Sequence, residues 1–278
     1  MGIIKAKIIN IKRVPKRVSK FYPRYYVYDL TVKDNHNFFV NKVLVHNSAS
    51  PWRIDNADLL LDAHTGPRCV DLSASELIRR GYLAKPTFYL YEFNHGRPTG
   101  TTYASFYEQQ VVKNVFRNKI IVQAALKAVA NNKTCLIAVT RIEHGQILEA
   151  MLKEILPSDK IVFASGQVDS DERKKILKDL NDRKLSIVIS TTVFGEGVDA
   201  PSLNVLINAK AAQSSVDSYQ LAGRAFRKTP TKDKATIIDI YDDHCKYLGK
   251  HAKSRLNIYK TESEFIIKKV SDLADIVY

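Results

Sequence analysis

The chain has 278 residues, of which 45% are hydrophobic and 26% charged, and its formal net charge is +14 at pH 7. This length is enough to bury a core in one large domain or two smaller ones. No apolar run reaches the roughly 18 residues of a membrane span, and the basic N-terminus has no apolar segment or cleavage site typical of a signal peptide. The three cysteines, Cys69, Cys135 and Cys245, form no CxxC pair. We therefore expect a cytoplasmic protein in a reducing compartment, with no membrane partner, no disulfide framework and no metal site.

The positive charge is concentrated at the N-terminus. Residues 1–47 contain ten Lys or Arg and two Asp, which gives +8 of the total +14. Apolar and basic residues alternate over residues 2–14, and residues 26–32 are again β-rich, so short strands are predicted. A segment this short is not expected to form a core alone. Its charge predicts an anionic partner, either nucleic acid or an acidic protein surface.

A different pattern follows residue 48. Residues 54–82 are predicted to be helical and mixed, and from residue 85 strands alternate with helices. The predicted strands are 87–93, 135–139, 160–164, 186–190, 204–207 and 235–240, and the predicted helices are 103–130, 142–155, 169–181, 215–226 and 243–258. This alternation predicts an α/β fold, a parallel sheet with helices on both faces. Residues 261–278 are predicted to form a tail or a single amphipathic helix.

The residues around position 47 carry a distinct chemistry. The sequence VYDLTV…NHNFFVNKVLVHNS contains Asp29, His36, His46, Asn47 and Ser48. These residues, about 23 in a row up to Ser48, resemble the C-terminal blocks of inteins. The resemblance implies that Ser48 is the nucleophile, that Asn47 cyclises to release the product, and that His46, His36 and Asp29 move protons and polarise carbonyls. Splicing of this kind needs no cofactor.

The N-terminal blocks of an intein are not found in this chain. We therefore interpret residues 1–47 as the β-rich, Hint-type C-terminal part of a split intein. Its predicted partner is an N-terminal helicase half that carries an acidic N-intein, because opposite charges speed encounter and suppress wrong pairing.

Several motifs after Ser48 resemble those of superfamily-2 helicases. QLAGRAFR at 220–227 resembles motif VI, STTVFGEGVDAP at 190–201 resembles motif V, and SASPWR at 48–53 resembles motif III with Ser50 in place of the usual threonine. Residues 136–141 and 164–166 lie where motif IV and its companion loop are expected. The sequence most resembles the UvsW-like and archaeal repair branch of DNA helicases, which implies a RecA-like fold.

The resemblance also implies roles for individual residues. Residues expected to contact ATP phosphates or line the nucleotide side of the cleft are Gln220, Arg224, Arg227, Gly197 and Asp199. On a helix, Arg224 and Arg227 would be three residues apart on one face. Residues expected on strand-end loops, against the nucleic-acid backbone, are Thr140, Ser165, Gly166 and Thr191. Backbone contacts of this kind do not read base sequence.

The chain contains no GxxxxGK[ST] phosphate loop and no DEAD/DEAH-type acidic motif. In this family those motifs precede motif III, so most of the binding of ATP and Mg²⁺ is expected from the N-terminal half. The predicted organisation is an intein segment at 1–47, the end of a first RecA-like domain with a linker at 48–85, a second RecA-like domain at 86–260, and a tail at 261–278.

The sequence thus predicts a precursor of the C-terminal part of an ATP-dependent DNA helicase, ligated to its N-terminal half by splicing at Asn47/Ser48. Two alternatives remain open. The chain is a non-catalytic nucleic-acid-binding module with a basic N-terminal arm, or it is a fragment of a helicase with an uninterrupted intein.

Overall fold

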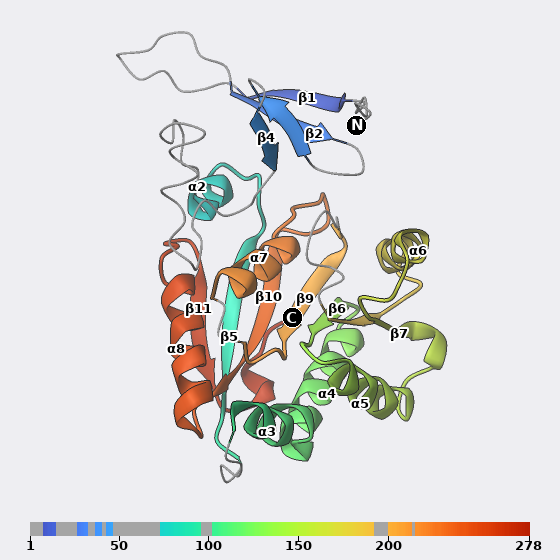
Figure 1. Ribbon diagram of the computed structural model, residues 1–278, viewed down its shortest axis with the longest axis vertical. Coiled ribbons are helices and arrows are strands. Elements are labelled where there is room, and N and C mark those ends of the chain that lie inside the picture. Colours follow the sequence, from blue (N-terminus) through green and yellow to red (C-terminus); the bar gives the residue numbers. More distant parts are fainter. Residues whose placement is uncertain are drawn as a thin grey trace. The chain divides into compact units, whose positions relative to one another are not determined.

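A computed structural model describes residues 8–14, 27–32, 37–40, 43–46, 73–95, 102–191, 200–212 and 215–278 (Figure 1). The chain divides into two compact units, residues 1–68 and 69–278. Each unit is described by itself.

The first unit contains two antiparallel strand pairs. β1 (Ile8–Val14) pairs with β2 (Val27–Val32), and β3 (Asn37–Val40) pairs with β4 (Val43–His46). Short strands are therefore confirmed at these positions. Asp29 lies opposite Lys12, and His46 at the end of β4 lies opposite Asn37. His36, Asn47 and Ser48 lie outside the described residues.

The second unit is built on a seven-stranded parallel sheet in the order β11-β5-β10-β9-β6-β8-β7. The strands are β5 (Lys85–Phe93), β6 (Thr134–Ala138), β7 (Ile161–Ala164), β8 (Ile187–Ser190), β9 (Leu203–Asn208), β10 (Lys234–Asp242) and β11 (Ile266–Val270). The helical elements are α2 (Ala74–Arg79), α3 (Tyr103–Tyr107), the π-helical turn η1 (Glu108–Val112), α4 (Val115–Ala130), α5 (Ile142–Lys153), η2 (Ser158–Lys160), α6 (Ser170–Asn181), α7 (Ser215–Ala225), α8 (Lys246–Tyr259) and η3 (Leu273–Asp275).

Both faces of this sheet are buried. Every residue of β6 and β8 is buried, because alternate side chains point into two different cores. Cys135 and Ile137 pack in the core on the side of α4 and α5. Leu136 and Ala138 pack in the core on the side of α6, α7 and α8. The prediction of a parallel α/β sheet with helices on both faces is confirmed.

The structure differs from the sequence prediction over residues 103–130, where one continuous helix was expected. The helix is interrupted after η1, and a separate helix, α4, begins after Asn114. The Asn114 side chain caps α4 by accepting a hydrogen bond from the Arg117 backbone N–H at 3.1 Å. Because α3 is not continuous with α4, the short α3 packs separately, at the end of the sheet.

The structure also differs over residues 261–278. This segment contains β11, which runs parallel to β5 at the edge of the sheet, and then η3. Leu273 and Ile276 of the segment are buried in the core beside α4. The hydrophobic pattern of IIKKV is too short to distinguish strand from helix, and backbone pairing with β5 decides the outcome.

Candidate nucleic-acid and nucleotide interface

The C-terminal ends of the parallel strands in the second unit lie on one side of the sheet, which we call the carboxyl edge. It comprises the loops after β6, β7, β8, β9 and β10, namely residues 139–141, 165–169, 191, 209–212 and 243–245. Thr140 follows β6, Ser165 and Gly166 follow β7, and Thr191 follows β8. Because β6, β8 and β7 are neighbours and parallel, these four predicted residues lie at adjacent positions of the edge.

The exposure of these residues suits contact with a large ligand. Thr140 and Gly166 are exposed, and Ser165 and Thr191 are half-buried. A Cβ atom added at Gly166 would meet no atom within 4 Å, so the backbone there is open to close approach. Hydroxyl groups and an open backbone are the donors that proteins use toward phosphodiester oxygens.

Helix α5 begins next to Thr140. Its N-cap residue, Arg141, makes no side-chain cap hydrogen bond. The first-turn acid, Glu143, is paired with Lys113 at 3.3 Å. The N-terminal N–H groups of α5 therefore have no side-chain cap, and the positive end of the helix favours an anion. By contrast, the N-terminus of α6 is capped by the Asp169 carboxylate, which accepts from the N–H groups of Asp171 and Glu172.

Helix α3 is joined to this edge by polar contacts. The Tyr107 hydroxyl donates to the Lys210 carbonyl after β9 at 2.6 Å. Thr140 is near enough to the same hydroxyl to lower its pKa, although burial has the larger effect. The Arg141 guanidinium lies 5.2 Å from the Tyr107 ring centroid, and its Nη2 donates to the Ala104 carbonyl at 3.3 Å. Burial is the main reason why the pKa of Tyr107 is raised. Sequence reasoning did not single out Tyr107 or Arg141, because their contacts join segments with no shared motif.

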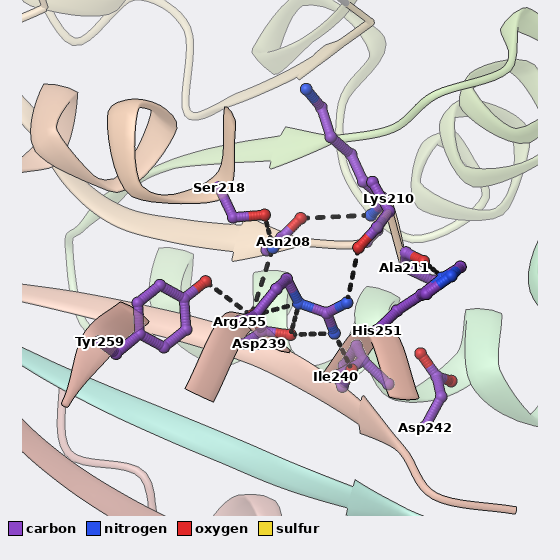
Figure 2. A network of polar contacts seen from close by, with 12 residues as sticks. Asn208, Lys210, Ala211, Ser218, Asp239, Ile240, Asp242, His251, Arg255 and Tyr259 are labelled. Carbon is purple, nitrogen blue, oxygen red and sulfur yellow. Dashed lines mark hydrogen bonds and ion pairs between the residues drawn. The ribbon is translucent and has the colours of Figure 1, made fainter. Parts of the chain in front are cut away.

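A buried polar network lies beneath the edge (Figure 2). Figure 2 shows Arg255 and Tyr259 of α8 and Asn208 of β9 converging on Asp239 of β10. Arg255 donates to both carboxylate oxygens, with Nε at 2.9 Å and Nη2 at 2.8 Å, and Tyr259 donates at 2.8 Å. Burial alone would lower the pKa of Arg255, but the charge and hydrogen bonds of Asp239 raise it above its ordinary value. The network ties α8 to the centre of the sheet.

A second buried ion pair joins Arg117 of α4 to Asp242 at the end of β10. Nε and Nη2 of Arg117 donate to the two carboxylate oxygens at 2.8 and 3.1 Å, and Nη1 donates to the Ala209 carbonyl at 3.1 Å. Removing one partner of such a pair costs about 3–5 kcal/mol, because it leaves a buried charge uncompensated. These two pairs hold the starts of the loops after β9 and β10 in place.

Helix α7 carries two of the residues predicted to contact phosphate, Gln220 and Arg224. Its buried stripe consists of Ser218, Leu221, Ala222 and Ala225, and it packs against β9, β10 and α8. Gln220 and Arg224 are four residues apart and half-buried, so they share the opposite, more exposed side of the helix.

Arg227 does not lie on this helix. α7 ends at Ala225, and Arg227 forms an antiparallel bridge with Leu83. The cause is Phe226, which is buried against Phe88 and Phe265 and whose carbonyl accepts from the Ala84 N–H at 2.7 Å. The prediction that Arg224 and Arg227 occupy one helical face is therefore wrong. Arg227 is exposed beside the start of β5, at the opposite end of the sheet from Thr140.

Some predicted residues cannot be placed in this way. Gly197 and Asp199 lie outside the described residues. In the described part of the chain, no group of three or more His, Cys, Asp or Glu side chains is arranged to hold a metal ion. Within the same residues, no helix has both the length and the apolar composition needed to cross a membrane.

The chain is similar to known helicases. Residues 117–229 match the helicase conserved C-terminal domain. The ATP-dependent DNA helicase UvsW of Enterobacteria phage T4 is 28% identical over 173 residues, which are 56% of this chain and 34% of the relative. Putative helicase 22 of a Sulfolobus islandicus filamentous virus is 25% identical over 244 residues, covering 82% of this chain and 42% of the relative.

The fold is similar as well. The crystal structure of T4 UvsW superimposes with a TM-score of 0.54 and 25% identity, over 66% of this chain and 41% of that chain. The chain thus spans between about a third and two fifths of the length of these relatives. The parallel sheet with its flanking helices is a RecA-like fold, and residues 117–229 match the helicase conserved C-terminal domain and are similar in sequence and fold to DNA helicases such as UvsW.

Proposed function

We propose that residues 48–278 supply the C-terminal part of an ATP-dependent superfamily-2 DNA helicase. The observation that carries this proposal is the carboxyl edge, where Thr140, Ser165, Gly166 and Thr191 follow three adjacent parallel strands. The hydroxyls, the open glycine and the N-terminus of α5 offer donors for phosphodiester oxygens. Such contacts hold a DNA strand without reading its sequence.

Helix α7 offers the chemistry for the second ligand, ATP. Guanidinium groups pair with phosphate oxygens in a bidentate way and stabilise the charge that develops during phosphoryl transfer. In this proposal Gln220, Arg224 and Arg227 contact the phosphates, and Gly197 and Asp199 line the nucleotide side of the cleft. The described residues hold no carboxylate cluster suited to Mg²⁺, and the sequence has no GxxxxGK[ST] loop. An N-terminal helicase half would therefore hold most of the ATP and the Mg²⁺.

Residues 1–47 are proposed to be a C-terminal intein segment that is removed during ligation. The Ser48 hydroxyl attacks the carbonyl at the upstream junction, which transfers the upstream chain to Ser48 as an ester and releases the first residue of the N-intein. The Asn47 side-chain amide nitrogen then attacks its own backbone carbonyl, which forms a succinimide and breaks the Asn47–Ser48 bond. The freed Ser48 amine finally takes the acyl group from the ester and forms the new peptide bond. His46, His36 and Asp29 assist by moving protons. The β3–β4 register supports this grouping, since it pairs Asn37, next to His36, with His46, next to Asn47.

The splicing proposal is tested by mixing the chain with an N-terminal helicase half that carries an acidic N-intein. We expect loss of residues 1–47 and a longer ligated product, measured by gel electrophoresis and intact mass. Asn47→Ala should block release of the 47-residue piece, whereas Asn41→Ala, in the same segment, should not. Release that persists in Asn47→Ala would contradict the assigned role of Asn47.

The DNA proposal is tested by measuring affinity for short single strands of different sequence at several salt concentrations. We expect equal affinities for the sequences and a fall of affinity with salt, because backbone contacts release counterions. Replacing the two edge hydroxyls in Thr140→Val/Ser165→Ala should weaken binding about tenfold. Thr231→Val, an exposed threonine at the other end of the sheet, is the matched control. DNA binding without any ligated product would favour the alternative of a non-catalytic binding module.

A further inference from the structure

Exposed apolar side chains gather at the carboxyl edge. Among the described residues, nine large hydrophobic side chains are exposed, and five of them lie on helices that begin next to this edge or bond to its loops. They are Tyr103 of α3, Val115 and Phe116 at the start of α4, Ile142 at the start of α5, and Tyr247 at the start of α8. Apolar exposure is therefore concentrated beside the residues proposed to hold a DNA backbone.

Two of these side chains are tyrosines whose rings are close together. Tyr103 is 46% exposed and Tyr247 is 59% exposed. Their ring centroids are 6.4 Å apart at an interplanar angle of 73°. Tyr247 also meets Phe106 at 6.4 Å in a tilted geometry. Neither contact is a face-to-face stack, and more than half of the Tyr247 side chain stays accessible, so the ring has surface left for a further contact.

The two tyrosine rings lie above a small buried core. Phe106 and Tyr107, which are 5% exposed, pack with Leu248 in a small core beneath them. His251 lies 5.8 Å from Tyr103, and its Nδ1 is 3.4 Å from the Ala211 carbonyl. The first turn of α8 is capped by Cys245, whose Sγ accepts from the Leu248 N–H at 3.3 Å. The two tyrosines are thus held by packed elements on both sides.

Contacts around this small core connect the two tyrosines to the segment that contains Thr140. Arg141, the residue after Thr140, donates to the Ala104 carbonyl next to Tyr103. Tyr107, one turn after Tyr103, donates to the Lys210 carbonyl, and its ring lies 5.2 Å from the Arg141 guanidinium. A strand held at Thr140 would therefore find the rings at a fixed separation from its backbone.

Local charge favours an anionic ligand. Lys246 and Lys250 are exposed on α8, and Lys250 is three residues from Tyr247, on the same side of the helix. Arg141 is close enough to Tyr103 to influence its phenol electrostatically. The acids nearby include Glu108, which pairs with Lys113 and Arg141, Glu143, which pairs with the same lysine, and the exposed Asp243. Aromatic rings among basic side chains are typical of surfaces that bind single-stranded nucleic acid.

We propose that Tyr103 and Tyr247 form a stacking platform for unpaired nucleobases of a DNA strand whose backbone is held at Thr140. This proposal rests on the proposed function, because it needs a strand at the carboxyl edge. Stacking on the platform is independent of base identity, since every base has a π face. The platform adds affinity for single strands over the backbone contacts alone.

The test compares two oligomers of equal length, twelve thymidine nucleotides and a fully abasic strand with the same sugar-phosphate backbone. Dissociation constants for the full chain are measured by fluorescence anisotropy. We expect the thymidine strand to bind at least about tenfold more tightly than the abasic strand. Tyr103→Ala/Tyr247→Ala should abolish this difference and leave the affinity for the abasic strand unchanged. Tyr103→Phe/Tyr247→Phe should keep the difference.

Tyr82 provides a matched control, because it is 62% exposed but follows α2, away from the carboxyl edge. Tyr82→Ala should behave as the unchanged protein. Equal affinity of the unchanged protein for both oligomers, or a difference that survives in the double alanine variant, would overturn the platform and leave the proposed function standing. A parallel loss for both oligomers in the double variant would also overturn it, because it indicates a structural role. Failure of the unchanged protein to bind either oligomer would refute the proposed function itself.

Discussion

Two regions of this protein use arginine in different ways. Beneath the carboxyl edge, Arg117 and Arg255 are 0% and 1% exposed, and each makes a bidentate pair with a single aspartate. At the end of α7, Arg224 is half-buried and Arg227 is exposed. The residue type is the same, but the surroundings differ in solvent access.

This difference separates stability from function. A buried guanidinium has lost its hydration, so it is tolerated only with a carboxylate and carbonyl acceptors around it. Its removal should destabilise the fold. A guanidinium that reaches solvent keeps capacity to contact a phosphate, so its removal should change chemistry more than stability. Four predictions test this comparison.

The largest effect is expected from Arg224→Ala in the ligated helicase. If Arg224 stabilises the transferred phosphate, the ATPase kcat should fall by about 10³-fold or more. Arg224→Lys should not restore the rate, because an ammonium group lacks the bidentate geometry. Steady-state ATP hydrolysis measures this, and urea denaturation should show a free energy of unfolding within about 1 kcal/mol of the unchanged protein. A normal kcat in Arg224→Ala would show that Arg224 does not act on the transferred phosphate.

The next largest effect is expected from Arg255→Ala. This change leaves the Asp239 carboxylate buried without its cation, so the free energy of unfolding should fall by about 3–5 kcal/mol. Urea denaturation followed by circular dichroism measures it. Arg79→Ala is the control, since Arg79 is 57% exposed and paired with Glu76 at 3.1 Å. That surface pair should contribute no more than about 1 kcal/mol. Equal losses in the two variants would contradict the comparison.

A pH effect of intermediate size is expected from His144. This side chain is buried, its Nε2 is 2.9 Å from Asn118 Oδ1, and its Nδ1 has no hydrogen-bond partner in the described part of the chain. Burial, with a smaller contribution from the Arg117 charge, lowers the pKa of His144 from 6.5 to about 3. The neutral ring therefore stabilises the fold above pH 6.5, and this stability is lost as pH falls from 6.5 toward 3, because the unfolded chain binds the proton first.

Between pH 7 and pH 5 the loss attributed to His144 should be about 2 kcal/mol. Urea denaturation at both pH values measures it, with His144→Gln as the comparison. The variant should lose less stability over this range than the unchanged protein. The same pH dependence in both would show that His144 titrates normally.

The smallest effect is expected from Tyr259→Phe. The Tyr259 hydroxyl donates to Asp239 at 2.8 Å, and burial and the Asp239 charge raise its pKa. Its removal leaves Asp239 paired with Arg255, so unfolding should become easier by only about 1–2 kcal/mol. Comparison with Arg255→Ala in the same denaturation assay ranks the two contacts. A loss as large as that of Arg255→Ala would mean that the hydroxyl, rather than the ion pair, anchors α8.

Part of the site could be predicted from sequence. The alternation of strands and helices indicates a parallel sheet, and residues that follow neighbouring parallel strands must meet at one edge. The resemblance to helicase motifs predicts Thr140, Ser165, Gly166 and Thr191 on strand-end loops, and the strand order brings these loops to one edge. Helical periodicity predicts Arg224 and Arg227 on one face, but α7 ends at Ala225, so this part of the prediction fails. These are local relations, since each depends on a few consecutive residues and a strand order.

The remaining features depend on contacts between distant segments. Arg117 and Asp242 are 125 residues apart, and nothing in either local sequence indicates their pairing. The exit of Arg227 from α7 depends on burial of Phe226 against Phe88 and Phe265. The pairing of Tyr103 with Tyr247 likewise joins α3 to α8. The sequence by itself thus determined the fold class, because periodicity records which side chains are buried, and its resemblance to helicase motifs indicated the residues of the edge loops. Only the tertiary structure decided which arginines are buried and which aromatic rings meet, because burial and ring contact depend on how distant segments pack.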